Sequence, residues 1–139
     1  MEQRLSIITL GVADLKNATD FYVDKFGWEK SSFSNDNISF FVLNGIQLAL
    51  FERTELAKDA GLPPEGNGFK AMTIAYNTRS KVDVDELILS LKNKGVKILK
   101  EPVQTNWGGY SSYIADLDNN VWEIAYNPYV KMDKQGNIN

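Results

Sequence analysis

The 139-residue chain contains neither cysteine nor histidine. Without cysteine it has no disulfide, no thiolate metal ligand and no thiol nucleophile, and without histidine it has no imidazole ligand and no histidine general base. These absences exclude Ser-His-Asp triads, Cys-His dyads, HExxH sites, zinc fingers and 2-His-1-carboxylate iron sites within this chain. Any chemistry must be carried by Asp, Glu, Lys, Tyr or a bound cofactor.

Long apolar runs and clustered charges are also missing. No apolar run approaches the roughly 18 residues of a membrane span, and residues 1–4 lead into a strand pattern instead of a signal-peptide core. The 15 Lys and Arg against 18 Asp and Glu give a net charge of −3, with no basic block that could neutralise a row of phosphates. We therefore expect a cytoplasmic protein that binds neither nucleic acid nor membranes.

The first half of the chain predicts a strand, a helix and three further strands. Residues 5–12 alternate between two faces, as in a half-buried strand. Asp14 can cap the helix that follows, and Gly27 can end it. The apolar stripe of this helix consists of Leu15, Ala18, Tyr22 and Phe26. The three further strands are expected at 28–33, 38–43 and 46–51. Asn44-Gly45 suits a type I′ turn between the last two strands.

The same order of elements returns in the second half, after a linker over 52–68 that contains a short helix at 55–60. Strands are expected at 69–77, 96–99, 110–116 and 121–127, and the helix with stripe Val84, Leu87, Ile88 and Leu91 ends at Gly95. The chain thus repeats a βαβββ motif. Module one spans about 4–51, the linker 52–68, module two about 69–128, and a polar tail at 129–139 is expected to fray. The linker is a plain connection or a segment that overhangs a site, and its length favours the former.

Each helix covers only one face of its sheet, so the other face needs a second module. In module one the uncovered face carries Ile7, Thr9, Gln47 and Phe51. In module two it carries Thr73 and Glu123. We therefore predict a single α+β domain of two βαβββ modules, whose eight mixed strands form a concave cavity.

Two runs of residues resemble the opening and closing patterns of the vicinal oxygen chelate superfamily, which contains glyoxalase I, extradiol dioxygenases, and fosfomycin and bleomycin resistance proteins. Val12-Ala13-Asp14-Leu15, with Phe21-Tyr22 and Phe26-Gly27, is similar to the opening V-x-D-L…F-Y…L-G. Residues 116–123 are similar to the closing D-P-D-G-N-x-x-E, with Leu117 in place of Pro and Asn119 in place of Gly. Asn is the residue next most tolerant of positive φ after Gly. Residues 107–110 also resemble a stretch of bacterial glyoxalase-like members, and the resemblance covers about 5–128.

The resemblance also bears on metals and on assembly. In metal-dependent members four ligands come from the inward faces of four strands, and these positions correspond to Ile7, Gln47, Thr73 and Glu123. Ile7 cannot coordinate, and the hydroxyl and amide of the next two are neutral, so one anionic ligand remains. We expect no metal and no other cofactor. Members commonly pair, so we expect a homodimer that covers the sheet edges and apolar strand faces near 38–43.

Glu123 is the first candidate for function, because strand alternation places it on the cavity side. It can serve as an acid, a base or an anchor for a ligand, or it can be a structural residue paired with Gln47. Tyr113 or Tyr110 can share proton transfer with it, although alternation does not decide which parity of 110–116 faces inward. The candidate ligand-binding residues are Thr9, Gln47, Phe51, Thr73, Trp107 and Tyr110. Aromatic residues are more often plain core.

Three functions remain open. The first is a metal-free module, as in the bleomycin-resistance branch, that holds a small aromatic or amphipathic molecule. The second is an enzyme of the lyase or isomerase type that uses Glu123 with Tyr113 or Tyr110 on a small carbonyl compound. The third is a metal-dependent lyase or dioxygenase with Glu123 as a metal ligand. Fold alone does not choose among these functions. The missing metal ligands argue against the third, and the second needs a charged partner for Glu123 that the sequence does not place.

Overall fold

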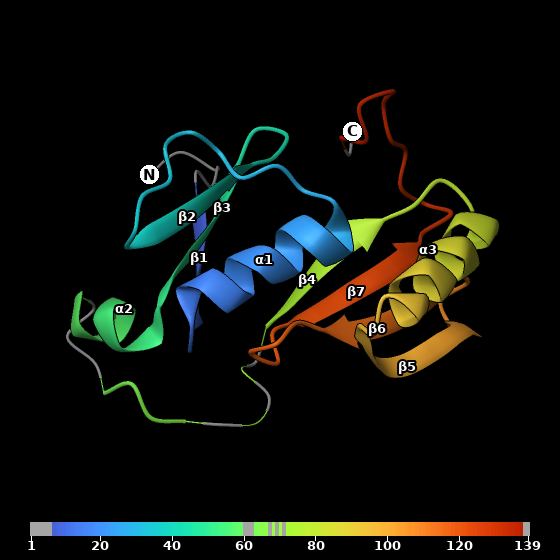
Figure 1. Cartoon of the computed structure of the whole chain (residues 1–139). Helices are drawn as coiled ribbons and strands as arrows, with labels where there is room; N and C mark the ends of the chain where they lie inside the picture. Colours follow the sequence, from blue (N-terminus) through green and yellow to red (C-terminus); the bar gives the residue numbers. More distant parts are fainter. Residues whose placement is uncertain (1–6, 60–62, 67, 69, 71, 138–139) are drawn as a thin grey trace. The chain divides into compact units, whose positions relative to one another are not determined.

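The computed structural model describes residues 7–59, 63–66, 68, 70 and 72–137. The chain divides into two compact units, Met1–Gly68 and Phe69–Asn139. Each unit has its own sheet, with a helix packed on it (Figure 1). The α+β fold with two related halves, which the repeated pattern of the sequence predicts, is confirmed.

The first unit has a three-stranded sheet in the order β1-β3-β2. β1 (Ile7–Val12) runs parallel to β3 (Gln47–Glu52), and β2 (Ile38–Val42) runs antiparallel to β3. α1 (Leu15–Phe26) packs on this sheet with Tyr22, whose buried ring lies 5.6 Å from that of Phe41. Aromatic contacts of this kind add to the hydrophobic burial that holds helix and sheet together.

Both ends of α1 are formed by the residues that the sequence indicates. The Asp14 side chain accepts a hydrogen bond from the backbone N–H of Asn17 at 2.7 Å, which satisfies one of the free donors at the start of the helix. Gly27 has φ 72°, the left-handed conformation that commonly ends a helix. The predicted helix and its two boundaries are therefore confirmed.

Residues 28–33 form no strand, contrary to expectation, so the described residues hold seven strands and not eight. Together with the residues that follow, this segment covers the outer edge of β2. The N–H of Ser31 donates to the carbonyl of Phe40 at 2.8 Å, and the N–H of Asn35 donates to that of Ile38 at 2.9 Å. The N–H of Phe40 in turn donates to Ser34 Oγ at 2.9 Å. The edge near 38–43 that was expected to face a second chain thus already has partners at Ile38 and Phe40.

The turn between β2 and β3 also differs from the type I′ turn expected at Asn44-Gly45. Gly45 has φ 74°, but among the described residues Asn119 is the one non-glycine residue with positive φ, so Asn44 does not take the left-handed conformation. A type I′ turn needs positive φ at both central residues. The connection still has only Asn44 and Gly45 between residues that face each other, since Val42 is in register with Gln47 and the N–H of Leu43 donates to the carbonyl of Ile46 at 2.9 Å, but it is not a type I′ turn.

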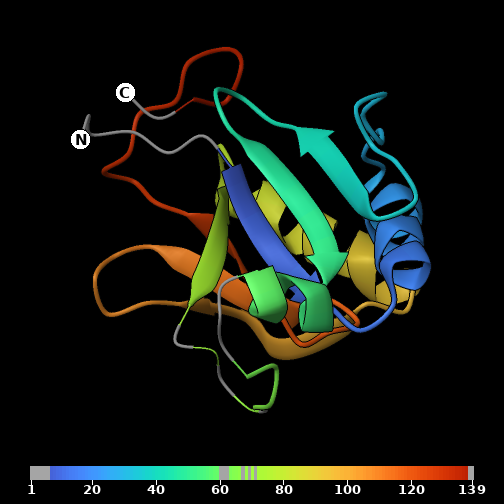
Figure 2. The same cartoon turned by 90° about the vertical axis from the view of Figure 1, so that its left-hand side faces the viewer.

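A second helix, α2 (Arg53–Asp59), follows directly after β3 and matches the short helix expected at 55–60, although residue 60 lies outside the described residues. Its first residue packs on Gly11 of β1, where an added Cβ would lie 3.3 Å from the Arg53 Cα. Figure 2 shows α2 in front of the end of β1. A larger residue at this point of the strand would press against the start of the helix.

The second unit has a four-stranded sheet in the order β4-β7-β6-β5. Its strands are β4 (Thr73–Asn77), β5 (Lys97–Gln104), β6 (Tyr110–Ala115) and β7 (Val121–Tyr126). α3 (Lys81–Asn93) packs on β5, β6 and β7 with the buried residues Val84, Ile88 and Leu91. β5 is longer than the strand expected at 96–99. β4 begins at Thr73, and residues 69 and 71 of the expected strand lie outside the described residues.

The turn between β6 and β7 is repeated in the C-terminal tail. Asp116 Oδ1 accepts from the N–H groups of residues 118 and 120, while its Oδ2 accepts from the Asn120 side chain. Asp133 makes the corresponding bonds to residues 135 and 137. Asn119 and Gly136 occupy the same place with φ 57° and 91°. Hydrogen bonds of Asp133 thus connect residues 133–137 of the tail.

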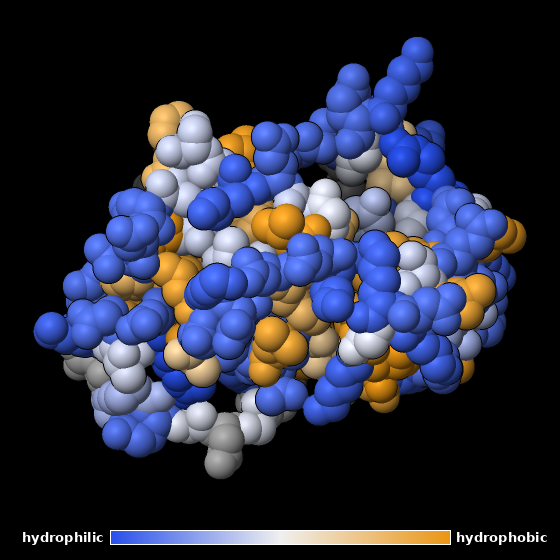
Figure 3. Space-filling view, in the orientation of Figure 1, coloured by the Kyte–Doolittle hydropathy of each residue, from blue (hydrophilic) through white to orange (hydrophobic). Residues whose placement is uncertain are grey.

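Polar residues predominate on the face shown in Figure 3, and hydrophobic residues reach it in small separate patches. Over the described residues, the most exposed large hydrophobic side chains are Tyr129 and Phe33, at 78% and 73%. Isolated exposed hydrophobic residues are normal on proteins and mark no site by themselves. No helix in this part of the chain has the length and apolar character that a membrane crossing needs.

Candidate functional site

A row of four side chains crosses the sheet of the second unit. Glu123 on β7 is in register with Ala75 on β4 and with Tyr113 on β6, and Tyr113 is in register with Lys100 on β5. Residues in register on neighbouring strands lie on the same face of a sheet. The row therefore places an acid, a phenol and a basic residue side by side.

This row lies on the face away from α3. The Tyr110 hydroxyl donates a hydrogen bond to Asp85 Oδ1 of α3 at 2.8 Å. Tyr110 lies on the same face of β6 as Ser112 and Ile114, because every second residue of a strand points to the same side. Ser112 and Ile114 are fully buried on this helix-covered side. Because side chains alternate along a strand, Tyr113 points to the opposite face. The question that alternation leaves open for 110–116 is thus answered by the contact with α3.

Tyr113 and Glu123 are joined by a hydrogen bond. The Tyr113 hydroxyl donates to Glu123 Oε1 at 3.1 Å, and both side chains are half buried. Partial burial raises the pKa of Tyr113, and the negative charge of Glu123 and this hydrogen bond raise it further. Tyr113 is therefore held protonated at neutral pH, as a donor beside a carboxylate.

Lys100 brings a positive charge to the other side of the Tyr113 ring. Its Nζ lies 5.9 Å from the ring centroid, within the range of a cation–π contact. β5 shifts register on both sides of Lys100, between Ile98 and Lys100 and between Lys100 and Val103. Such irregularities re-aim side chains along a strand. Sequence reasoning missed Lys100, because the strand was expected to end at Leu99.

The strand register also bears on the four positions that correspond to the metal ligands of the family, Ile7, Gln47, Thr73 and Glu123. Ile7 pairs with Gln47 in the first unit, whereas Thr73 pairs with Val121 in the second. If Ile7 and Thr73 are equivalent in the internal repeat, the equivalent of Gln47 is Val121. The equivalent of Glu123 is then Ala49, which has no ligand atom. The four positions Ile7, Gln47, Thr73 and Glu123 are therefore not all related by the repeat.

Two other predicted site residues of the second unit lie apart from the row. Tyr110 faces α3, and its hydrogen bond to Asp85 raises the pKa of its hydroxyl. Trp107 lies in the loop between β5 and β6, with its indole over Gly109, so that a Cβ at Gly109 would overlap the ring. Trp107 as a whole remains 42% exposed. The glycine thus serves the packing of Trp107 on its own loop.

The candidate residues of the first unit share one face of its sheet. The neighbours Leu10 and Val12 are buried, whereas Ile7 is 48% exposed and Thr9 is exposed, as the alternation predicts for β1. Gln47 is in register with Ile7. Phe51, in register with Gly11, lies on the same side. This face is the one on which α2 packs at Gly11.

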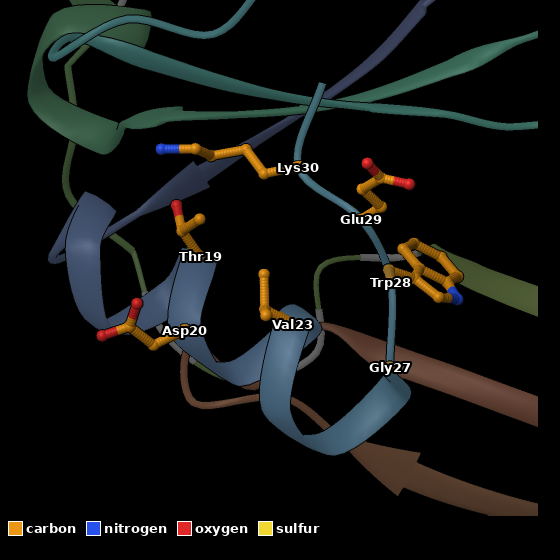
Figure 4. Close-up of a pocket in the computed structure, with 7 residues that line it drawn as sticks. All are labelled: Thr19, Asp20, Val23, Gly27, Trp28, Glu29 and Lys30. Carbon is orange, nitrogen blue, oxygen red and sulfur yellow. The ribbon is translucent and has the colours of Figure 1, made fainter. Parts of the chain in front are cut away.

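No group of three or more carboxylates that could hold a metal ion occurs among the residues described. A pocket of about 510 Å³ instead lies in the first unit, beside α1 and the segment after it (Figure 4). It is lined by Thr19, Asp20, Val23, Gly27, Trp28, Glu29 and Lys30. It is wide open, and the Thr19 hydroxyl is already bonded to Leu15 and Ser39. Polar groups do not converge there as they do around Glu123, so the row remains the better candidate site.

Comparison with known proteins gives matches over most of the chain. The family model described as Glyoxalase/Bleomycin resistance protein/Dioxygenase superfamily matches residues 4–124. Fosfomycin resistance protein FosX of Listeria monocytogenes is 30% identical over an alignment of 129 positions that covers 86% of this chain and 86% of that protein. A glyoxalase-related enzyme from Fulvimarina pelagi is 33% identical, with a TM-score of 0.89 over 99% of this chain and 98% of that one. A lactoylglutathione lyase from Agrobacterium tumefaciens, 24% identical, shares the fold with a TM-score of 0.71 over 91% of this chain and 96% of that one.

Proposed function

Because the chain belongs to the Glyoxalase/Bleomycin resistance protein/Dioxygenase superfamily, we propose that it binds a small molecule, without a metal ion, on the face that carries Glu123. The observation that supports this proposal is the hydrogen bond from Tyr113 to Glu123, with Lys100 on the far side of the ring. Glu123 accepts one hydrogen bond from the described residues, and a carboxylate can accept another from a ligand. The row therefore offers an acceptor, an aromatic surface and a cation within one face.

This chemistry suits a small aromatic or amphipathic molecule with a hydrogen-bond donor. The donor would reach Glu123, and the flat or apolar part would lie against the Tyr113 ring. In the first unit we propose ligand contacts for Thr9, Gln47 and Phe51, which share one face.

The metal of the metal-dependent family members does not fit the donor set of this chain. Ile7 has no donor atom, Ala49 has none, and Thr73 and Gln47 have only neutral oxygens. Glu123, the one anionic candidate, is bonded to the neutral hydroxyl of Tyr113. Tight divalent sites need more charged or imidazole ligands than this. We therefore derive no step that involves a metal.

A second function, acid–base catalysis, is favoured by the same hydrogen bond. Glu123 can take a proton from a substrate carbon or hydroxyl, and the protonated Tyr113 can donate one to a carbonyl oxygen. An enzyme of the lyase or isomerase type on a small carbonyl compound would use the pair in this way. The relatives with enzyme names support this alternative, and the dioxygenase alternative would need the metal that the donor set does not suit.

A thermal-shift screen in EDTA tests the proposal, followed by the same screen with added divalent metals. The compounds are small aromatic and carbonyl molecules, together with fosfomycin, because one relative carries its name. A ligand at 100 times its Kd is expected to stabilise the protein by roughly 2.7 kcal/mol in EDTA.

The Glu123→Gln variant should lose this shift. Glu101→Gln is the matched control, because Glu101 lies on the same sheet but is exposed and paired with Lys92 at 2.5 Å. Stabilisation that appears only with a metal, or that survives equally in both variants, would contradict the proposal.

A further inference from the structure

Arg53, the first residue of α2, is held in place by its backbone and by its side-chain stem. Its Cα, Cβ and Cγ lie 3.3–3.4 Å from where a Cβ of Gly11 would be, so the stem rests on β1. Its Nε donates to the carbonyl of Pro64 at 2.6 Å. The residue is half buried. Two points of attachment, one on each side, thus orient the guanidinium before any ligand arrives.

The outer end of this guanidinium has no partner within the part of the chain that the structure describes. Among the described residues, Arg53 takes part in no ion pair, and neither Nη1 nor Nη2 donates a hydrogen bond. Gly66 lies next to Nη2, and a Cβ there would be 3.3 Å from this nitrogen. Gly66 has φ 136°, a conformation that other residues rarely adopt. The backbone therefore keeps the space beside Nη2 free of a side chain.

A guanidinium whose Nε is fixed and whose two Nη groups are open presents a planar pair of donors. This geometry matches the two oxygens of a carboxylate or a phosphate. A half-buried cation without an acidic partner is also costly unless an anion compensates it. We propose that Arg53 is an anion-binding residue that takes the carboxylate or phosphate group of a small ligand on the first unit.

The site is on the face of the first sheet opposite α1, because the Cβ direction of Gly11 is that of Ile7 and Thr9. The ligand contacts would come from the side-chain nitrogens. Glu123 belongs to the other unit and is not part of this anion site.

Nuclear magnetic resonance of protein with ¹⁵N-labelled arginine tests the proposal, because the chain has only three arginines: Arg4, Arg53 and Arg79. Inorganic phosphate and acetate are titrated separately, at constant ionic strength set by sodium chloride. The Nε–Hε signal of Arg53 should shift along a saturating curve with at least one of the two anions. Arg79, whose Nη2 already donates to the carbonyls of Asp133 and Lys134, is the internal control and should not follow that curve.

The Arg53→Lys variant keeps the charge and loses the planar pair of donors. We expect it to need about tenfold more anion to shift the backbone signals of Gly11 and Gly66, since charge-assisted hydrogen bonds are the strong ones. Arg79→Lys should leave these signals at the wild-type concentration. Amide spectra of both variants that otherwise match the wild type establish that each is folded. A linear shift shared by Arg53 and Arg79, or an unchanged response in Arg53→Lys, would overturn the proposal.

Discussion

Replacing Glu123 by Gln removes the negative charge beside Tyr113 and keeps the size of the side chain. Partial burial, the charge of Glu123 and the hydrogen bond to Glu123 raise the pKa of Tyr113. The variant removes the charge at position 123 and weakens the hydrogen bond to Tyr113, but it leaves the burial of Tyr113 unchanged. The pKa of Tyr113 should therefore fall toward the ordinary tyrosine value and stay above it.

The effect on stability follows from two opposed contributions. A hydrogen bond to a charged group contributes about 1.5–3 kcal/mol and a neutral one about 0.5–1.5 kcal/mol, and both figures shrink where the groups are half exposed. Against this loss stands the relief from burying a carboxylate without a cation in contact. At pH 7 we expect the unfolding free energy of Glu123→Gln to lie at most about 1 kcal/mol below that of the wild type. It can also exceed the wild-type value if the relief from burying the charge is the larger contribution. Tyr113→Phe, which leaves the carboxylate without its donor, should lose about 1 kcal/mol.

The pH dependence of stability has a definite sign. The folded-state pKa of Tyr113 is raised above its ordinary value of 10.0. The stabilisation linked to its proton is thus fully present below pH 10.0 and is lost as the pH rises through the folded-state pKa. The difference in unfolding free energy between wild type and Tyr113→Phe should therefore shrink above pH 10.0.

Two measurements check these expectations. The phenolate absorbance of the six tyrosines is titrated in the wild type, in Glu123→Gln and in Tyr113→Phe, and the difference from the last isolates Tyr113. Urea denaturation at pH 7 and at alkaline pH gives the free energies. Titration of Tyr113 at the same pH with and without the Glu123 charge would contradict the expected fall of its pKa. A clear loss of stability in Glu123→Gln with unchanged ligand binding would make Glu123 structural.

Three further outcomes follow from the donor set, the family and the packing. After dialysis the protein should hold no stoichiometric divalent metal, because one carboxylate and neutral oxygens bind such ions weakly, and metal analysis that finds one ion per chain would contradict this. Light scattering should give about twice the chain mass of 15.6 kDa, since members of the family commonly pair, whereas a mass near 15.6 kDa would exclude the dimer. Gly109→Ala should displace Trp107 and cost about 1–3 kcal/mol, and unchanged tryptophan emission and urea midpoint would count against the packing described for this loop.

The parts of the fold that depend on nearby residues could be predicted from the sequence. The cap at Asp14 and the left-handed Gly27 act within one helical turn of the residues that they affect, so the boundaries of α1 follow from local chemistry. The alternation of β1 is equally local. Residues 28–33 are different, because Ser31 bonds to Phe40 on β2 and a propensity for strand cannot foresee this contact.

The candidate site was predicted only in part, for the same reason. Glu123 follows from alternation on a strand whose ends are clear. The choice between Tyr113 and Tyr110 depends on which face meets α3, and Asp85, 25 residues from Tyr110, makes that contact. Lys100 could not be found, because Pro102 and the charges around it resemble a loop, and the irregular register of β5 hides the alternation.

Chemical-shift mapping tests most directly whether a small molecule binds at Glu123 without a metal. The best compound from the screen is titrated into ¹⁵N-labelled protein in EDTA, and the shifts are followed to saturation. We expect the largest shifts at Lys100, Tyr113 and Glu123, and we expect Glu123→Gln to lose them. Largest shifts at Val23 and Trp28 of the open pocket beside α1, or shifts that appear only after a divalent metal is added, would contradict it.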